Sequence, residues 1–178
     1  MRWSIVLAIV LTVARVADAA EPGQLPVIHL EMDNEAAVPA AILKRSQDEV
    51  ARIFSDVGLG VKWTETGPRF TVQMTTRSPE YSGAEPTVMG VASRTPTGAT
   101  AQIFFNQVQT FAVRSHVDVG RLLAYVIAHE IGHLLLPQMR HSLTGLMKAD
   151  WDSDLVREAA TGSLTFTGSQ IKRLHAFR

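Results

Sequence analysis

The stretch from residue 129 to residue 141 reads HEIGHLLLPQMRH, and the interpretation of the whole chain depends on it. His129 and His133 are four residues apart, and on a helix this spacing places two side chains on one face, one turn apart. Glu130 is rotated by about 100° around the helix axis from His129. His141 comes later, after a proline. Either these residues form a metal site, or the chain has two helix histidines and an unrelated third.

The pair His129 and His133 can aim two imidazoles at one metal ion, and Zn²⁺ accepts such nitrogens at about 2.0–2.1 Å. Glu130 points elsewhere, but it can reach a water molecule at that ion, which is where a general base must stand. This chemistry predicts hydrolysis of peptide bonds. An ordinary structural role is disfavoured, because the surrounding helix is apolar and buried polar groups without partners are costly.

A catalytic zinc site needs a third protein ligand besides one open position. His141 is the first candidate, because Pro137 ends the helix and seven residues then separate His133 from His141, enough for the chain to return. An acidic ligand is the alternative, with Glu158 at a plausible distance. Three aspartates downstream offer a further choice, although such residues near a helix start more often cap it: Asp150, Asp152 and Asp154. No pattern supports the other three histidines, His29, His116 and His175.

Composition limits the function further. The chain has 178 residues, the size of one domain, with 17 basic and 17 acidic side chains. A net charge near zero predicts neither nucleic acid nor an anionic membrane as a partner, since both need a basic face. Cysteine is absent, so disulfides, thiolate ligands and a cysteine nucleophile are all excluded. Any metal must be held by histidine or carboxylate, and the expected partner is a peptide or protein substrate.

The first 19 residues have the pattern of a signal peptide. Arg2 supplies a positive charge, Trp3 to Val13 is a short apolar run, and Ala17-Asp18-Ala19 matches a cleavage site. The run is short for a membrane span, and Arg15 argues against the alternative of an uncleaved anchor. We therefore predict a signal peptide at 1–19 and an exported domain at 20–178. The mature protein would be secreted or periplasmic, with no stable membrane association.

Hydrophobic periodicity predicts the remaining elements. We expect helices at Pro39 to Val57, at Val119 to Leu136 around the motif, and from about Thr167. Loops are expected at 77–87 and 138–154. Strands are expected at Val27–Met32, Val61–Thr64, Phe70–Thr76, Val88–Ser93 and Thr100–Phe105. This order predicts one α+β domain in which a mixed, twisted sheet packs on the N-terminal helix and the motif helix, followed by a C-terminal helix.

The longer stretch HEIGHLLLPQMRHSLTGLM resembles the metzincin clan of zinc metalloproteases. That clan has the signature H-E-x-x-H-x-x-G-x-x-H, followed by a tight turn with a methionine below the metal. The nearest likeness is to small secreted bacterial members with a longer loop before the third histidine. The resemblance implies a zincin-like fold and a Zn²⁺ cofactor. It also implies ligands at His129, His133 and His141, the general base at Glu130, and the turn methionine at Met147.

Two departures from the clan pattern concern the segment after His133. Leu136 stands where the clan has glycine, and the third histidine comes two residues late. Both are explained if Pro137 ends the helix and a longer loop makes the turn. Met147 has simple core packing as an alternative role, which overlaps with that of a turn methionine. If His141 is not a ligand, a gluzincin-like hydrolase using Glu158 is the first alternative arrangement.

The sequence indicates less clearly which residues bind the substrate. Thr100–Phe105 is the candidate for an exposed edge strand that pairs with a peptide, and an interior strand is its alternative. Tyr125 is one turn before His129, where core packing is favoured over approach to the metal. Trp151 could line a pocket or cover the turn. The competing functions are a non-catalytic zinc-binding or partner-binding module and a hydrolase of non-protein amides; the presence of Glu130 favours catalysis.

Overall fold

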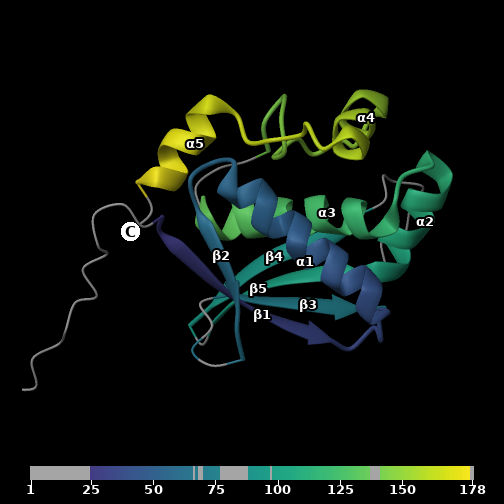
Figure 1. The fold of residues 1–178 in the computed structure, drawn as a ribbon, viewed down its shortest axis with the longest axis horizontal. Helices are drawn as coiled ribbons and strands as arrows, with labels where there is room; N and C mark the ends of the chain where they lie inside the picture. The colour runs from purple at the N-terminus through teal and green to yellow at the C-terminus, as the bar shows by residue number, and fades with distance from the viewer. Residues whose placement is uncertain are drawn as a thin grey trace, which may run out of the picture.

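The computed structural model describes residues 25–65, 67, 70–76, 88–96, 98–136 and 141–176. Five strands form one sheet, α1 and α3 lie on one of its faces, and the segment that carries α4 and α5 lies beyond α3 (Figure 1). The predicted α+β domain is confirmed. The elements are β1 (Val27–Asn34), α1 (Ala40–Ser55), β2 (Gly60–Trp63), β3 (Phe70–Thr75), β4 (Gly90–Thr95), β5 (Gly98–Phe104), α2 (Phe105–Ser115), α3 (Val119–Leu135), α4 (Ser153–Thr161) and α5 (Gly168–His175).

The sheet is mixed, as predicted, and its strand order is β2-β1-β3-β5-β4. The pairs β1–β2, β1–β3 and β3–β5 are parallel, whereas β4 pairs with β5 in the antiparallel direction. The candidate edge strand at Thr100–Phe105 therefore corresponds to β5, which is interior. Among the described strands, β4 stands at the edge on this side of the sheet.

The sheet is apolar on the face that the helices cover and polar on the other. On the open face, Gln102 donates a hydrogen bond to Gln73 at 3.2 Å, and Gln73 donates to Glu35 at 3.0 Å. This alternation fixes the register, because a shift by one residue would expose the apolar set. The buried set is Ile28, Leu30, Phe70, Val72, Met74, Ala101 and Ile103.

Helix α3 is buried along almost its whole length, which explains why its sequence is apolar on every side. It packs against α1, α2, β4 and β5, and against α4 on the side away from the sheet. Asp118 caps its N-terminus by accepting a hydrogen bond from the amide of Arg121 at 2.9 Å. Its last residue is Leu135, one residue earlier than predicted.

Two helices were not predicted. Helix α2 follows β5 without a loop or a side-chain cap, so the sequence carries none of the usual signals between them. Helix α4 begins inside the predicted loop, with Asp152 as its cap and Gly162 after its end in the left-handed conformation. That cap pattern was visible in the sequence. Helix α5 begins after Thr167, as expected.

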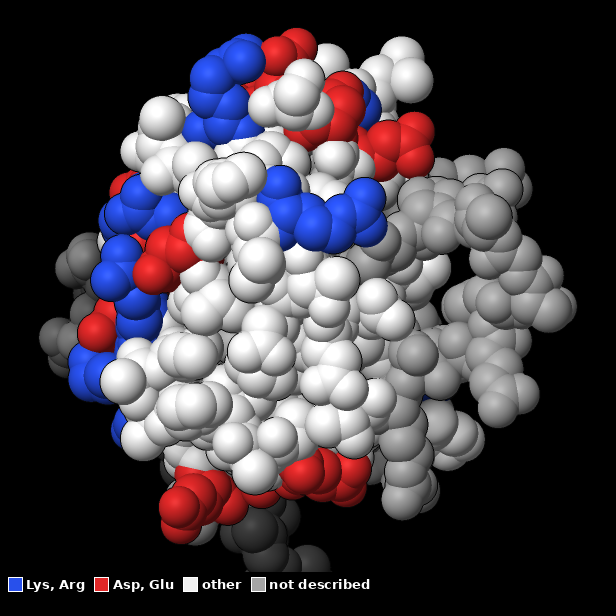
Figure 2. Space-filling view, turned by 90° about the vertical axis from the view of Figure 1, so that its right-hand side faces the viewer, with Lys and Arg blue, Asp and Glu red and all other residues white. Residues whose placement is uncertain are grey.

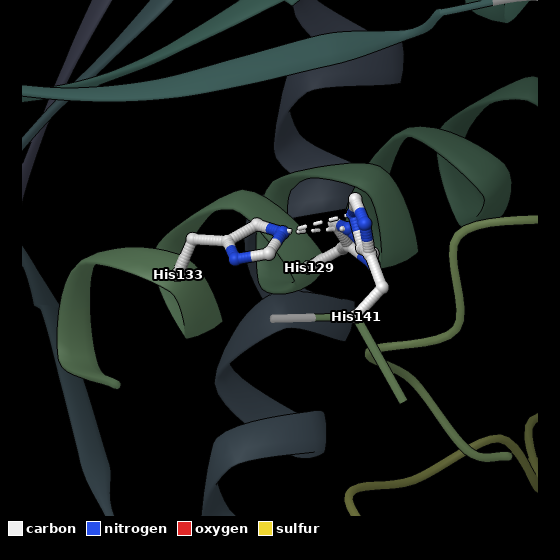
Figure 3. Close-up of side chains that lie close together, drawn as sticks. All are labelled: His129, His133 and His141. Atoms are coloured by element: carbon white, nitrogen blue, oxygen red, sulfur yellow. Dashed lines mark hydrogen bonds between the residues drawn. The ribbon is translucent and has the colours of Figure 1, made fainter. Parts of the chain in front are cut away.

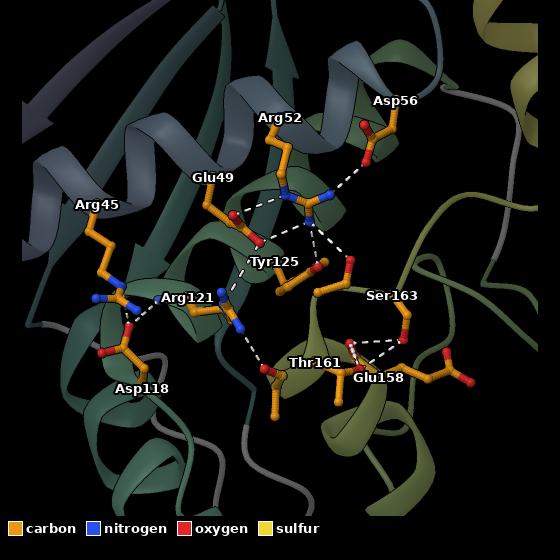
Figure 4. Close-up of polar contacts among 12 residues, drawn as sticks. Arg45, Glu49, Arg52, Asp56, Asp118, Arg121, Tyr125, Glu158, Thr161 and Ser163 are labelled. Carbon is orange, nitrogen blue, oxygen red and sulfur yellow. Dashed lines mark hydrogen bonds and ion pairs between the residues drawn. The ribbon is translucent and has the colours of Figure 1, made fainter.

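Polar contacts join α1 and α3 to the segment around α4 (Figure 4). Arg52 donates hydrogen bonds to Glu49 at 2.9 Å, to the Tyr125 hydroxyl at 3.0 Å and to the carbonyl of Gly162 at 3.1 Å. Arg121 donates to the carbonyl of Ala160 at 2.5 Å. Tyr125 is thus a core residue directed towards α1, the role that the sequence favoured.

On one face of the molecule, charged side chains of both signs lie along the top and the left, acidic ones lie at the lower edge, and much of the centre is without charged side chains (Figure 2). No helix in the described ranges is both long and apolar enough to cross a membrane. The predicted signal peptide, the loop at 77–87 and Pro137 lie outside the described residues.

Candidate metal centre

Three histidines converge at the C-terminal part of α3 (Figure 3). The Nε2 atom of His133 lies 3.1 Å from Nε2 of His129 and 3.2 Å from Nε2 of His141. Two nitrogens bound tetrahedrally to one zinc ion at 2.0–2.1 Å are about 3.3 Å apart, so these separations suit a shared ion. Within the described ranges, this is the one group of three or more His, Cys, Asp or Glu residues with metal-binding geometry.

The ring of His129 is oriented by a hydrogen bond on its far side. Its Nδ1 atom lies 2.7 Å from the carbonyl oxygen of Leu146, so Nδ1 carries the proton and Nε2 is left with a free lone pair. Burial lowers the pKa of His129 from 6.5 to about 4, and the neighbouring histidines add to this effect. At neutral pH the ring is therefore uncharged, which is the form that binds a metal.

The turn after His141 brings that Leu146 carbonyl into place. Gly145 has a positive φ of 72°, a conformation that glycine adopts without strain. The amide of Ser142 donates to the carbonyl of Met147 at 2.8 Å, and the amide of Lys148 donates to that of Gly145 at 3.0 Å. Met147 is fully buried, and its sulfur lies 2.4 Å from where a Cβ on Gly132 would stand. The methionine of the turn thus packs directly beneath the motif helix.

Glu130 is buried against the edge strand β4 rather than in the group of histidines. Its side chain is so close to Gly90 that a Cβ there would lie 2.8 Å from its Cγ and 2.9 Å from its Oε1. Burial raises the pKa of Glu130 from 4.5 to about 7, partly offset by a hydrogen bond from the backbone amide of Ala92. Sequence reasoning missed Gly90 and Ala92, because nothing in the sequence pairs β4 with the motif helix.

Two pockets open on either side of this centre. The larger, about 530 Å³, runs along β4 and includes Arg94, Glu130 and His133. The smaller, about 230 Å³, includes His129, Glu130 and Trp151. Both include Gly90, Glu130 and His141, so the two pockets adjoin at these residues, and together they are called the cleft here. Trp151 therefore lines a pocket.

The other candidate ligands lie elsewhere. Glu158 is exposed on α4, and its backbone carbonyl accepts a hydrogen bond from the amide of Ser163. His116 ends α2 in the left-handed conformation, and His175 bonds to the carbonyl of Val57 at 2.7 Å. None of the following residues belongs to the histidine group among the described residues: His29, His116, His175, Asp150, Asp152, Asp154 and Glu158.

Comparison with known proteins bears on the fold. No protein-family model and no curated protein matches the chain. Its fold is similar to the solved structure of a zinc-dependent peptidase from Methanocorpusculum labreanum (strain Z), with a TM-score of 0.54 and 16% sequence identity. The alignment covers 83% of this chain and 99% of the other. At this identity the likeness concerns the fold, and it is the three histidines that indicate a metal at this site.

Proposed function

We propose that this protein is an exported zinc-dependent endopeptidase of the metzincin type. The observation that carries the proposal is the convergence of three imidazole nitrogens beside the buried carboxylate of Glu130, at the junction of an open cleft. Three neutral nitrogens are a donor set that suits Zn²⁺, and they leave a fourth position open. His129, His133 and His141 would hold the ion. The predicted signal peptide at 1–19 supports export.

The residues of the chain divide the chemistry between them. A zinc ion at this site would supply a Lewis acid that polarises the peptide carbonyl and makes water more acidic. Glu130 accepts a proton from the attacking water and delivers it to the nitrogen of the leaving amine as the C–N bond breaks. The Ala92 amide orients the Glu130 carboxylate, and the Leu146 carbonyl keeps His129 in its binding tautomer. Met147 supports the helix under the site.

Strand β4 is suited to hold the peptide. The amide of Phe104 donates to the carbonyl of Met89, so every second residue of β4 turns its backbone groups towards β5. The backbone groups of Gly90 and Arg94 and the carbonyl of Ala92 then point to the outer edge, beside the cleft, while the Ala92 amide bonds to Glu130. An extended peptide can add to such an edge by main-chain hydrogen bonds. Strand β4 thus takes the role that was expected of Thr100–Phe105.

The test combines metal analysis with a conservative variant. Purified protein loaded with zinc should contain about one zinc per chain and cleave an unfolded protein such as casein. Glu130→Gln keeps the shape of the side chain and removes the base, so zinc content should be retained while the cleavage rate falls by roughly 10²–10⁴-fold. Wild-type protein without bound zinc, or a Glu130→Gln variant with full activity, would overturn the proposal.

A further inference from the structure

The two pockets of the cleft differ in charge. Arg94 lines the larger pocket, whereas the smaller pocket, called here the Trp151 pocket, is lined by Asp150 and by no lysine or arginine among the described residues. Arg94 itself is bound, because it donates a hydrogen bond to the carbonyl of Leu134 and lies 5.7 Å from the centre of the Phe70 ring. The cleft therefore presents side chains of opposite charge on the two sides of the metal centre.

The Trp151 pocket has the size and walls for one long side chain. Its volume of about 230 Å³ is below the roughly 300–1,000 Å³ of sites that take drug-sized ligands. Its walls include Met89, Val126, Ala149 and the half-buried indole of Trp151. An unbranched methylene stem would bury its apolar surface against these groups while its polar end stays in water.

Asp150 gives the pocket its charge. It is exposed, so its carboxylate stands where the pocket opens to solvent. Lys148, two residues earlier, forms its ion pair with Asp152. Asp150 has no ion pair among the described residues, although the charge of Lys148 also acts on it, so its carboxylate can still pair with a cationic ligand. A cation in the Trp151 pocket would meet this carboxylate, which attracts positive charge, and the face of the indole would add to the attraction where the cation stacks on it.

We infer that the Trp151 pocket selects a lysine or arginine side chain at one of the two residues flanking the bond to be cleaved. This inference rests on the proposed peptidase function and names the substrate class of the same site. The stem of the basic residue lies along Val126, Ala149 and Trp151, and its cationic end reaches Asp150. An apolar residue of the same length contacts the apolar walls of the pocket but makes no interaction with Asp150.

The test starts from the zinc-loaded protein and unfolded β-casein, whose cleavage sites are mapped by mass spectrometry. Peptides built on the best site then carry lysine, norleucine or glutamate at each flanking position in turn. Norleucine matches the lysine stem without its charge. We expect the wild-type protein to prefer lysine at one flanking position by roughly fivefold in kcat/KM over norleucine, the factor that a solvent-exposed ion pair supports.

Variants of Asp150 identify the source of the preference. Asp150→Asn should bring the lysine-to-norleucine ratio close to one, Asp150→Glu should retain the preference, and Asp150→Lys should shift it towards glutamate. Asp154→Asn is the matched control: it removes an equal charge from an exposed residue nearby that does not line the cleft, and it should keep the wild-type ratio.

Cleavage with no preference for lysine, or a lysine-to-norleucine ratio that does not depend on Asp150, overturns the inference alone. Absence of any cleavage by the zinc-loaded protein overturns the proposed function and the inference with it.

Discussion

The histidine that comes late in the motif has the most exposed position in the metal centre. His129 is buried and its ring is fixed by the carbonyl of Leu146, whereas His141 is exposed and follows the undescribed residues 137–140. Its Nε2 atom nevertheless lies 3.2 Å from that of His133. His141, on the turn side of the cleft, thus adds a third imidazole nitrogen to the two that α3 provides.

A pair of substitutions distinguishes His141 from the acidic alternative. If His141 is a ligand as proposed, His141→Ala should weaken zinc binding by well over the 10–100-fold that loss of an outer partner costs. Glu158→Gln should leave zinc affinity unchanged, since Glu158 is exposed on α4 and outside the histidine group. Titration with a competing chelator measures both. Zinc affinity that depends on Glu158 and not on His141 would contradict the three-histidine site.

Glu130 should make the stability of the metal-free protein depend on pH. Its pKa in the folded protein is about 7 against an ordinary 4.5, so between these values the folded state keeps a proton that the unfolded state has lost. Stability is therefore lost as pH rises through this window, by up to about 3 kcal/mol for a shift of this size. The Glu130→Gln variant should not lose stability in this pH window, because glutamine has no carboxylate to titrate.

His129 also contributes to the pH dependence of stability, but this contribution cancels when metal-free Glu130→Gln is compared with metal-free wild type. The lowered pKa of His129 acts in the opposite direction, because the unfolded state takes up its proton first as pH falls. Urea unfolding at about pH 5 and about pH 8 should show Glu130→Gln gaining stability relative to wild type at the higher pH. An equal difference at both values would show that Glu130 is not buried as described.

At the scale of elements, α3 and the turn below it meet at Gly132. A Cβ at this position would stand 2.4 Å from the Met147 sulfur and 3.1 Å from the Phe166 ring. Gly132→Ala should therefore destabilise the protein by about 1–3 kcal/mol through overpacking. It should also weaken zinc binding, because displacing Met147 moves the adjacent Leu146 carbonyl that orients His129.

Gly168→Ala is the control for this experiment. Gly168 begins α5, and a Cβ there would meet nothing within 4 Å. Thermal unfolding and zinc titration should show a loss of stability and of zinc affinity for Gly132→Ala and no loss of either for Gly168→Ala. If Gly132→Ala matches Gly168→Ala in both measurements, the turn does not depend on close packing under the helix.

The elements that were predictable have periodic apolar residues and distinct ends. Helices α1 and α3 and the strands of the sheet meet this condition, and their boundaries agree with the sequence to within a few residues. Helix α2 was missed because Phe104 leads from strand to helix without a turn residue. The edge position of β4 could not be read from its sequence, since strand order depends on pairing between distant segments.

The same distinction holds within the metal centre. The spacing of His129, Glu130 and His133 is local, so the helix period alone places them. The contacts of Glu130 with Gly90 and Ala92 join residues about 40 positions apart, and only the packing of β4 on α3 creates them. The placement of His129, Glu130 and His133 was therefore open to sequence reasoning, whereas the backbone groups that surround Glu130 were not.

At the scale of the whole molecule, Arg52 holds three parts of the fold together. It lies on α1, bonds to Tyr125 one turn before His129 on α3, and reaches the carbonyl of Gly162 after α4. Its main partner is Glu49, whose side chain is only 14% exposed. The hydrogen bond and charge of Arg52 lower the pKa of Glu49, against the opposing effect of burial.

Replacing Arg52 by methionine keeps much of the apolar stem and leaves Glu49 and the Gly162 carbonyl without this donor. We expect a loss of about 1–3 kcal/mol at neutral pH, because a charge-assisted hydrogen bond to a largely buried carboxylate is lost while Arg121 and Tyr125 remain beside it. Because the folded pKa of Glu49 is lowered, its contribution is present above its unfolded pKa and disappears as pH falls through the folded value. The difference in unfolding free energy between wild type and Arg52→Met should therefore narrow from about pH 7 to about pH 4.

Arg157→Met is the control: it breaks an exposed ion pair with Asp154 and should cost less than about 1 kcal/mol. Urea unfolding of both variants measures these effects, and equal losses for the two would mean that Arg52 acts as an ordinary surface residue.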